Sequence, residues 1–469
     1  MSDQRPVVVW FRQDLRLADN PALTAAAATR QPLLAVYVLD DESPGDWAMG
    51  AASRWWLHQS LVALNDSLKG VLCLLHGRAD QVLSALVRDS GATAVYCNET
   101  SEPWQMAGDA AIAQMLAGDD VALHSFNGST LFDRQQALKA DGTPYRVFTP
   151  FYSKGCLENS AAPREPIPVP DLSRLVVSDR GAALSALGLM PTIDWYGSIE
   201  QTWQVGEEAA LARLDTFLDT GLPGYHEGRN IPARPHVSRL SPHLHFGEIS
   251  PNQAWYALAP LLGDGRLRND IDSFRRELGW REFSRYLLRY FPELPKQNFQ
   301  SKFDRFPWRE DPESLTRWQL GMTGYAMVDA GMRELWQTGY MHNRVRMIVG
   351  SFLIKNLLLH WRHGEEWFWD TLVDADLANN SASWQWVAGT GADAAPYFRI
   401  FNPVTQGLKF DPDGDYVRRF VPELRGLEGR SVHEPWKLPR AKRESFDYPE
   451  PIVDLKVTRE RALAVFKAL

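Results

Sequence analysis

The first third of the chain alternates short apolar runs with segments of helical period, and this alternation constrains the fold more than any other feature. Unbroken apolar runs of strand length are typical of strands buried on both faces of a parallel sheet. The predicted strands and helices are Val7–Phe11, Leu33–Leu39, Ala51–Leu68, Val71–Leu75, Ala79–Arg88 and Ala94–Cys97. This order predicts an open α/β sheet with crossover helices. No GxGxxG or phosphate loop follows the first strand, so a dinucleotide held there in the usual way is not expected.

A proline-rich stretch, Ala162–Pro170, ends this pattern, because proline cannot continue a helix or a central strand. After Val205, apolar residues recur at three- and four-residue spacing, which predicts helices. The predicted helices are Glu207–Thr220, Asn252–Leu262, Asp270–Tyr290, Gly324–Thr338, His342–Trp361 and Glu365–Leu372. We therefore expect a Rossmann-like α/β domain over residues 1–135, a connector over residues 136–205 and an all-α domain over residues 206–469.

The composition is that of a globular protein, with 45% hydrophobic and 23% charged residues. The net charge of -8 excludes a uniformly basic surface, but nucleic-acid binding requires only a local one. No apolar run approaches the roughly 20 residues that cross a bilayer, and the N-terminus does not resemble a signal peptide. We expect a cytoplasmic protein without a membrane anchor.

Cysteine and histidine give no sign of a metal site. The three cysteines, Cys73, Cys97 and Cys156, are scattered and show no metal-ligand spacing, so we expect buried, reduced thiols. His243 and His245 alternate, but no cysteine or carboxylate set accompanies them, and we expect no metal. The 18 tryptophans are unusually many for a chain of this length, but most tryptophans serve protein cores, so the count only raises the question of where they cluster.

Two helical segments bring unlike side chains onto one face. In ELGWREF, the spacing of Glu277, Trp280 and Arg281 presents a carboxyl, an indole and a guanidinium together, although an ion pair beside a core tryptophan gives the same pattern. In MHNRVRM, Asn343 and Met347 share a face while the two arginines point elsewhere. An amide beside a thioether suits a flat heteroaromatic ligand, and a core position for the methionine is the alternative.

Two further segments favour a polar cofactor pocket. In DADLANNSASWQW, the carboxylates of Asp374 and Asp376 precede asparagines, and a salt bridge from Asp374 to Arg346 is more consistent with the sequence than a metal site. Asn380 is able to hydrogen-bond either protonation state of a flavin ring nitrogen. In SRLSPHLHFGEIS, serine hydroxyls beside an arginine form either a phosphate cradle or a helix cap.

Seven segments together resemble one known family. They are WFRQDLRLADNPAL, TPYRVFTPF, SRLSPHLHFGEIS, ELGWREF, TGYAMVDAGMREL, MHNRVRM and WQWVAGTGADAAPYFRIFNPVTQG. In this order they resemble the photolyase and cryptochrome family over nearly the whole chain, most closely the bacterial class I cyclobutane pyrimidine dimer photolyases. The resemblance implies an α/β domain that holds an antenna chromophore and a helical domain that holds FAD, which is fully reduced (FADH⁻) when active.

The resemblance also implies roles for individual residues. The residues expected to contact FAD are Tyr225, Val237, Ser238, Arg239, Leu240, Ser241, Phe274, Arg281, Asn343, Arg346, Asp374, Ala375, Asp376 and Asn380. Of these, Asn380 faces the flavin N5, and Phe274 stands where relatives often have tryptophan. The residues expected near a flipped-out dimer or its DNA backbone are Arg229, Glu277, Trp280, Asn343, Arg344, Met347, Trp386 and Arg399. Glu277, if protonated, donates a hydrogen bond to the dimer radical anion.

Three tryptophans match the family's electron relay to the flavin, and they are Trp308, Trp361 and Trp384. The expected activity is light-driven repair of pyrimidine dimers in UV-damaged DNA by a monomer. The alternatives are a six-four photolyase and a cryptochrome photoreceptor. Six-four photolyases carry histidines where Asn343 and Met347 stand, and cryptochromes often replace the asparagine that this chain keeps at Asn380, so both differences favour the cyclobutane dimer. A dark flavin oxidoreductase would need a nicotinamide site that the sequence does not display.

The antenna chromophore is open from the sequence. The folate-binding relatives carry an Asn-Glu pair after the fourth strand, where this chain has Trp104 and Gln105, although Lys296 matches a folate-contacting lysine. The pair Glu102 and Pro103 resembles the deazaflavin-binding branch instead. Methenyltetrahydrofolate, 8-hydroxy-5-deazaflavin and no antenna are the three expectations.

Overall fold

The structure, a computed structural model, describes residues 5–469 and divides into two compact units. The first, here called the sheet unit, comprises the chain through Trp195 together with Trp203–Asp219 and Ser238–Pro292. The second, here called the helical unit, comprises Tyr196–Thr202, Thr220–Val237 and Glu293–Leu469. Because these units interleave along the chain, they are not the continuous domains expected from the sequence, whose boundaries at residues 135 and 205 stay predictions.

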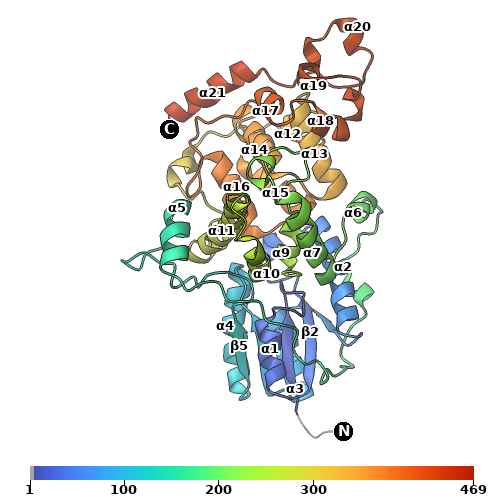
Figure 1. Cartoon of the computed structure of the whole chain (residues 1–469), viewed down its shortest axis with the longest axis vertical. Helices are drawn as coiled ribbons and strands as arrows, with labels where there is room; N and C mark the ends of the chain where they lie inside the picture. Colours follow the sequence, from blue (N-terminus) through green and yellow to red (C-terminus); the bar gives the residue numbers. More distant parts are fainter. Residues whose placement is uncertain (1–4) are drawn as a thin grey trace. The chain divides into compact units, whose positions relative to one another are not determined.

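The sheet unit contains the expected parallel sheet, with strand order β3-β2-β1-β4-β5 (Figure 1). The strands are β1 (Val7–Phe11), β2 (Leu33–Leu39), β3 (Cys73–His76), β4 (Ala94–Asn98) and β5 (Ala122–Phe126). All pairs are parallel, which confirms the α/β fold class. The sequence analysis missed β5 because this edge strand is half-exposed and has no apolar run.

Helices cover both faces of this sheet. They are α1 (Pro21–Ala28), α2 (Ala51–Ser67), α3 (Ala79–Ser90) and α4 (Pro103–Gly118). Helices α3 and α4 pack on each other and bury the face that carries Val8, Trp10 and Val36, whereas α1 packs on β1 and β4. The order of the strands reverses between β1 and β4, so right-handed crossovers place α1 and the α3–α4 pair on opposite faces.

The connector is attached to the sheet unit by a buried carboxylate. Asp19 accepts hydrogen bonds from the backbone N–H of Ile167, from the Arg164 guanidinium and from the Ser250 hydroxyl. Residues 173–176 also bond to the start of β2 through Leu33. The proline-rich stretch is thus irregular, as expected, and is fixed by side chains and single backbone bonds.

The remaining helical elements of the sheet unit, the last residues of η4 apart, are α5 (Phe148–Pro150), η2 (Phe151–Glu158), η3 (Leu184–Leu187), α7 (Glu207–Thr216), η4 (Phe217–Gly221), α9 (Ser241–Phe246), α10 (Pro251–Tyr256), η5 (Ala259–Leu261) and α11 (Arg268–Tyr290).

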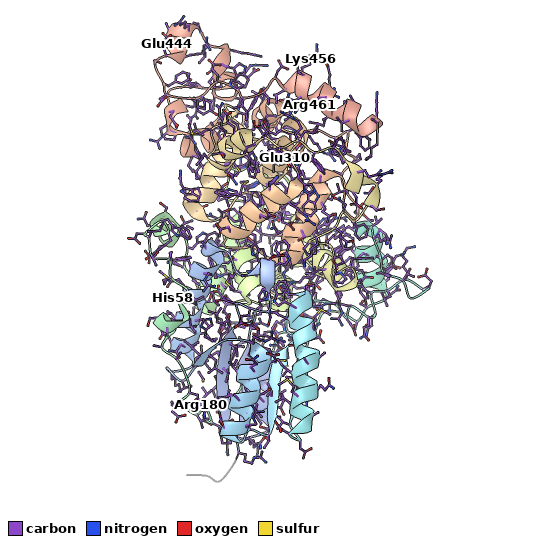
Figure 2. The ribbon with its side chains drawn as sticks, turned by 180° about the vertical axis from the view of Figure 1, so that it is seen from behind. His58, Arg180, Glu310, Glu444, Lys456 and Arg461 are labelled. Carbon is purple, nitrogen blue, oxygen red and sulfur yellow. The ribbon has the colours of Figure 1, made fainter. Side chains whose placement is uncertain are left out.

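The helical unit contains helices alone among its described elements, as expected. They are α6 (Gly197–Thr202), α8 (Tyr225–Gly228), η6 (Ser301–Arg305), α12 (Pro312–Gln319), α13 (Ala326–Thr338), α14 (Asn343–Ser351), η7 (Phe352–Asn356), α15 (Trp361–Thr371), α16 (Leu377–Ala388), α17 (Pro403–Phe410), α18 (Asp415–Phe420), η8 (Pro422–Leu424), α19 (Arg430–His433), η9 (Pro435–Lys437), α20 (Arg440–Arg443) and α21 (Leu455–Lys467). Figure 2 labels Lys456 and Arg461 on the last of these. Over residues 5–469, no helix is both long and apolar enough to cross a membrane.

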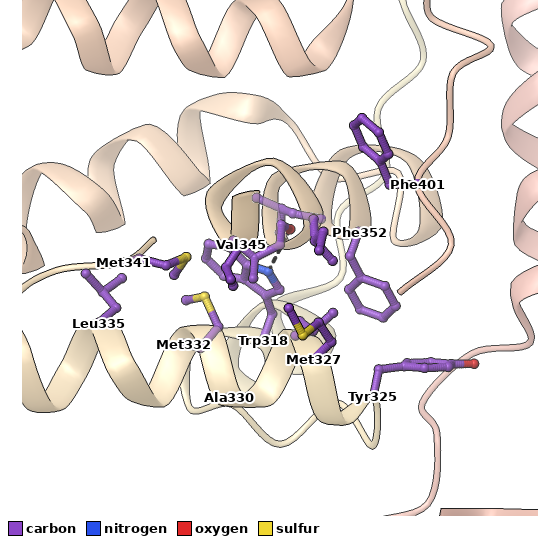
Figure 3. Close-up of a cluster of buried hydrophobic side chains, with 14 of the residues drawn as sticks. Trp318, Tyr325, Met327, Ala330, Met332, Leu335, Met341, Val345, Phe352 and Phe401 are labelled. Atoms are coloured by element: carbon purple, nitrogen blue, oxygen red, sulfur yellow. Dashed lines mark hydrogen bonds between the residues drawn. The ribbon is translucent and has the colours of Figure 1, made fainter. Parts of the chain in front are cut away.

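The core of the helical unit forms around α13 and α14 (Figure 3). Trp318 is fully buried there, and its indole N–H donates to the carbonyl of Val349 at 3.1 Å. Met327 and Met332 from α13 pack in the same cluster as Phe352. Burial of large apolar side chains of this kind stabilises a fold by roughly 1.5–3 kcal/mol each. This core fixes α14, which carries several of the expected site residues.

The predicted helix over His342–Trp361 is wrong in its second half. Helix α14 ends at Ser351, a π-helical turn follows over Phe352–Asn356, and Leu358 adopts a left-handed backbone with φ of 62°. The chain restarts as α15 with His360 as the N-cap. No glycine or proline marks this break, and Leu358 is held by burial against an aromatic cluster. Tertiary packing therefore overrides the local periodicity.

Candidate functional site

Helix α14 begins at a buried histidine. The Nδ1 of His342 accepts a hydrogen bond from the backbone N–H of Arg344 at 3.1 Å, which caps the helix. Burial lowers the pKa of His342 to about 3, and the nearby charges of Arg344, Arg346 and Arg229 lower it further in the same direction. The imidazole is therefore neutral near pH 7, as an accepting cap requires. Asn343, which follows it, is exposed.

Arg344 does not point away from Met347, contrary to the sequence-based expectation. Its guanidinium lies 3.6 Å from the Met347 sulfur, donates to the side-chain oxygen of Asn230, and stacks over the Phe410 ring at 4.5 Å. A long arginine side chain bends along the helix to reach the residue three positions later. The amide of Asn343, the thioether of Met347 and the guanidinium of Arg344 thus lie on one end of α14.

Three arginines expected at the DNA gather in the helical unit. Burial, and then the charges of Arg229 and Arg399, lower the pKa of Arg344. Among residues 5–469, neither Arg344 nor Arg399 has a carboxylate within salt-bridge distance, and Arg399 is exposed. Arg229 lies over the ring of Tyr225 at 5.6 Å. Like charges gathered in one place raise the local positive potential, which suits a polyanion.

The expected salt bridge between Arg346 and Asp374 is confirmed. The Nη2 of Arg346 donates to both carboxylate oxygens of Asp374 at 2.8 and 3.0 Å, and its Nε donates to the carbonyl of Met341 at 2.7 Å. Burial opposes the charge on Arg346, but the partner carboxylate raises the pKa of the guanidinium overall. Two residues on, Asp376 caps α16 by accepting from the backbone and side chain of Asn379. Ala375 between them is buried.

Asn380 is held in a defined orientation on α16. Its Nδ2 donates to the backbone carbonyl of Glu365 at 3.0 Å, and the residue is only 8% exposed. This bond leaves the amide oxygen as the group able to accept a hydrogen bond from a ligand. An acceptor at this position is the feature that a reduced flavin N5–H requires.

Glu365 is a buried carboxyl that the sequence analysis missed. Its Oε1 accepts from the Ser381 hydroxyl at 2.5 Å, while its Oε2 has no partner among residues 5–469. Burial raises the pKa of Glu365 to about 8, which the Ser381 hydrogen bond opposes. This group is therefore protonated near pH 7. A glutamate within a predicted amphipathic helix gives no signal of burial, so the sequence did not reveal it.

We expect this proton to make folding stability depend on pH. The pKa of Glu365 in the folded state, about 8, lies above its usual value of 4.5, so its contribution is fully present below about pH 4.5 and is lost as the pH rises through 8. Between those limits the loss is about 1.4 kcal/mol per pH unit. The variant Glu365→Gln removes this slope, as measured by urea unfolding at pH 5, 6.5 and 8. Glu366→Gln, at the exposed neighbour, serves as the control and keeps it; equal slopes in all three proteins would contradict the assignment.

The three expected relay tryptophans all lie in the helical unit and differ in exposure. Trp384 and Trp361 are buried, and Trp308 is half-buried. His360 lies between the last two, with ring centroids 5.2 Å from Trp308 and 5.4 Å from Trp361. Gly364, one turn along α15 from Trp361, packs so closely on Trp384 that a Cβ there would be 2.0 Å from its ring. The close packing explains why glycine is required at this position.

The remaining expected site residues lie in the sheet unit, mostly on α11. Trp280 stacks on Phe148 with a centroid distance of 3.7 Å, and Phe274 packs against Phe217 at 4.9 Å. Arg281 donates to the carbonyl of Ser129 at 2.9 Å, and Glu277 is half-buried.

The run from Val237 to Ser241 contains a sharp turn at Arg239. Arg239 has a left-handed backbone with φ of 53°, and its guanidinium lies over the Trp203 ring at 4.6 Å. The Ser238 hydroxyl accepts from the backbone N–H of Leu240 at 3.4 Å. A left-handed backbone in a non-glycine residue is uncommon and marks this turn as a candidate functional feature.

The carboxyl ends of β1 and β4 carry a hydrogen-bonded polar network. The Asn98 amide donates to Asp14 at 2.6 Å and to Asn20 at 2.8 Å, and Arg12 forms an ion pair with Asp109 at 2.6 Å. Ligands of open α/β sheets bind at such a topological switch point. The three cysteines are buried and free, and the part of the chain that the structure describes holds no cluster of three potential metal ligands.

Comparisons with known proteins agree with this arrangement. The family model described as "DNA photolyase" matches residues 7–171, and the one described as "FAD binding domain of DNA photolyase" matches residues 274–468. A deoxyribodipyrimidine photo-lyase of Agrobacterium fabrum is 50% identical, with 99% of this chain and 98% of the relative covered. The chain belongs to the photolyase and cryptochrome family.

Other relatives show the breadth of this family. A crystal structure of a class III photolyase from Agrobacterium tumefaciens superposes with a TM-score of 0.93 at 48% identity, covering 100% of this chain and 98% of the other. Cryptochrome-1 of Arabidopsis thaliana is 35% identical, with 97% of this chain and 69% of the relative covered. The family match confirms the expectation of a photolyase-type fold with an FAD-binding helical domain. The expected class I assignment within the family stays a prediction.

Proposed function

We propose that this protein repairs cyclobutane pyrimidine dimers in UV-damaged DNA, using light. When bound, fully reduced FAD supplies the electron that opens the cyclobutane ring and receives it back afterwards. The chain's own residues bind the DNA backbone, hold the flavin and position the dimer. A dimer is less costly to flip out of the duplex than an intact base pair, since its stacking and pairing are already disturbed.

The observation that carries this proposal is the gathering of arginines in the helical unit. The charge of Arg344 interacts with those of both Arg229 and Arg399, and neither Arg344 nor Arg399 has a carboxylate within salt-bridge distance among residues 5–469. A protein with a formal charge of -8 gains nucleic-acid affinity only from such a local concentration of cations. Guanidinium groups bind phosphate with two parallel hydrogen bonds.

The residues present in the helical unit fit a flavin. Asn380 presents an amide oxygen to accept from N5–H, and the salt bridge of Arg346 with Asp374 offers polar groups for the polar edge of the ring. Asp376 and Tyr225 complete the set that we propose for FAD in this unit. The turn at Arg239 and the α11 residues Phe274 and Arg281, which are also expected at FAD from the sequence, lie in the sheet unit, and that expectation stays a prediction.

Exposed polar side chains at the start of α14 favour the cyclobutane dimer over the six-four photoproduct. Asn343 is exposed and Met347 is half-buried, so an amide and a soft thioether are presented where six-four enzymes carry histidines. Trp386 on α16 is half-buried and offers a planar surface for a base. A cryptochrome photoreceptor is the second candidate, favoured by the 35% identity to Cryptochrome-1.

Illumination of the purified, chemically reduced protein with an oligonucleotide that contains one thymine dimer tests the proposal. We expect light-dependent loss of the dimer, followed by restored cleavage at a restriction site that spans it. A six-four oligonucleotide should stay unchanged. Persistence of the thymine dimer under light would contradict repair and favour the photoreceptor. The antenna, methenyltetrahydrofolate or 8-hydroxy-5-deazaflavin, is assigned by the absorption spectrum of the native protein.

A second experiment addresses Glu277 on α11. We propose that its carboxyl donates a hydrogen bond to the dimer as negative charge develops there, so Glu277→Ala should lower the repair yield per photon by about tenfold, equivalent to 1.4 kcal/mol. FAD content should be unchanged. Glu310→Ala, at an exposed glutamate labelled in Figure 2, is the control. An unaltered quantum yield in Glu277→Ala would remove this role.

A further inference from the structure

Lys355 is a buried lysine with no carboxylate partner. It lies in the π-helical turn that follows α14 and is 0% exposed. Its ammonium donates one hydrogen bond, to the backbone carbonyl of Arg399 at 3.0 Å, and lies 5.3 Å from the centroid of the Tyr397 ring. Within residues 5–469, no Asp or Glu is within salt-bridge distance of it. None of the roles proposed above uses this side chain.

Burying a charged lysine at this position costs free energy rather than stabilising the fold. An ammonium has three donors, and here a single carbonyl and a π face receive it. Burial lowers the pKa of Lys355 to about 7, and the charge of Arg399 lowers it in the same direction. Its chain neighbours Leu353 and Ile354 belong to the apolar core of the helical unit, and methionine, which has a similar length, would carry no charge into this place. Packing alone therefore does not account for the lysine.

The partner of Lys355 is a tight turn. The backbone N–H of Arg399 donates to the carbonyl of Pro396 at 2.8 Å, which closes the turn, and the Tyr397 ring is buried against Phe466. Just beyond it, the N–H of Phe401 donates to the hydroxyl of Ser351 at 3.1 Å. Because Ser351 and Lys355 are four residues apart, one stretch of helix holds the turn at two points.

The same helix carries Arg344 at its other end. We propose that Lys355 is a positioning residue that holds the turn bearing Arg399 against the end of α14, so that the guanidinium groups of Arg399 and Arg344 face the DNA backbone together. This inference rests on the proposed binding of damaged DNA. Lys355 touches neither the flavin nor the DNA, and it acts through the carbonyl of Arg399.

The position also makes DNA binding depend on pH. The charged or titratable groups around Lys355 are Arg399 and Tyr397 in the turn and Arg461 of α21, which bonds to the carbonyl of Asn356. Arg309 and Asp311 act in turn on Arg461. With a pKa of about 7, Lys355 carries its charge at pH 6 and loses it by pH 8. A charged ammonium binds the carbonyl of Arg399 more strongly than a neutral amine does, so the turn should be held less firmly, and DNA affinity should fall, as the pH rises.

The test is a double-mutant cycle with Lys355→Met and Arg399→Ala, using a labelled oligonucleotide with one thymine dimer at pH 6 and pH 8. Lys355→Met should weaken binding at pH 6 by about tenfold, while repair at saturating DNA, FAD content and melting temperature are retained. Combined with Arg399→Ala, it should add no further loss. The wild type should bind more weakly at pH 8 than at pH 6, and Lys355→Met should lose this difference. Lys456→Met, which removes the same charge from an exposed position of α21, should behave as the wild type.

The outcomes separate the two proposals. If the wild-type protein does not distinguish dimer-containing DNA from undamaged DNA, the proposed function fails. If the wild type does distinguish them but Lys355→Met binds equally well, the role of Lys355 is overturned. Losses from Lys355→Met and Arg399→Ala that add fully would also overturn it, since a residue that acts through Arg399 has no effect once that side chain is gone.

Discussion

Replacing Trp384 with phenylalanine is expected to slow the light-driven reduction of oxidised FAD by at least about 100-fold, equivalent to about 3 kcal/mol of activation free energy. Trp384 is buried in the helical unit, with the Phe368 ring centroid 4.9 Å from its own and Gly364 packed against its ring. A benzyl ring is much harder to oxidise than an indole, so it does not pass an electron onward. The measurement is the rate at which flavin absorbance bleaches under blue light with an external reductant.

The same variant should repair dimers normally once its flavin has been reduced chemically, because the relay restores the flavin and does not act on the DNA. Trp308→Phe should slow photoreduction in the same way, from the half-buried end of the series. Trp436→Phe is the matched control, since this tryptophan packs edge-on against Tyr325 in the helical core. Photoreduction at the wild-type rate in Trp384→Phe would show that electrons reach the flavin by another route.

The sequence predicted the sheet well because buried parallel strands have a strong local signal. Val7–Phe11 and Leu33–Leu39 match β1 and β2 at both ends, since each is an unbroken apolar run. The edge strand β5 was missed for the opposite reason: half of its side chains face solvent, so its sequence ALHSF resembles a loop. Strand prediction from one sequence thus depends on burial on both faces.

Helix boundaries were predicted well where a capping residue or glycine marks them. Helix α13 ends at Thr338 as expected because Gly339 follows in a left-handed conformation. The break between α14 and α15 carries no such residue, since Leu358 takes the left-handed conformation that glycine would ordinarily supply. Its cause is burial against residues more than fifty positions away in sequence, such as Ala462, and no local window contains that information.

Some of the site residues were likewise predictable from the sequence and others were not. The salt bridge between Arg346 and Asp374 was predictable from charge and from the resemblance, and it is present. Lys355 and Glu365 were not predictable, because a charged residue in an amphipathic helix is ordinarily exposed. The structure distinguishes both residues because each is buried, Glu365 with one carboxyl oxygen that has no hydrogen-bond partner and Lys355 with no carboxylate partner, among residues 5–469. Those are properties of the folded core.

Replacing Arg344 and Arg399 together with alanine is expected to have the largest effect on DNA binding. Loss of the two guanidinium groups that we propose to contact phosphate should weaken binding by about 100-fold or more, at about 1.4 kcal/mol or more each, and should reduce the salt dependence by about two counterions. The effect should be similar for all flanking sequences, because phosphate contacts carry no sequence information. The measurement is the dissociation constant of a dimer-containing oligonucleotide at a series of salt concentrations.

The salt series separates a direct role from a structural one. Arg344 also bonds to Asn230 and stacks on Phe410, so its loss has a packing component that is insensitive to salt. Arg459→Ala, at an exposed position of α21, removes one positive charge and serves as the control with an unchanged slope. If the double variant binds weakly with the wild-type slope, the arginines shape the helical unit without touching phosphate. If the slope falls by about two while FAD content is retained, the gathered arginines are the backbone contact, because only counterions displaced from the DNA make affinity depend on salt in this way.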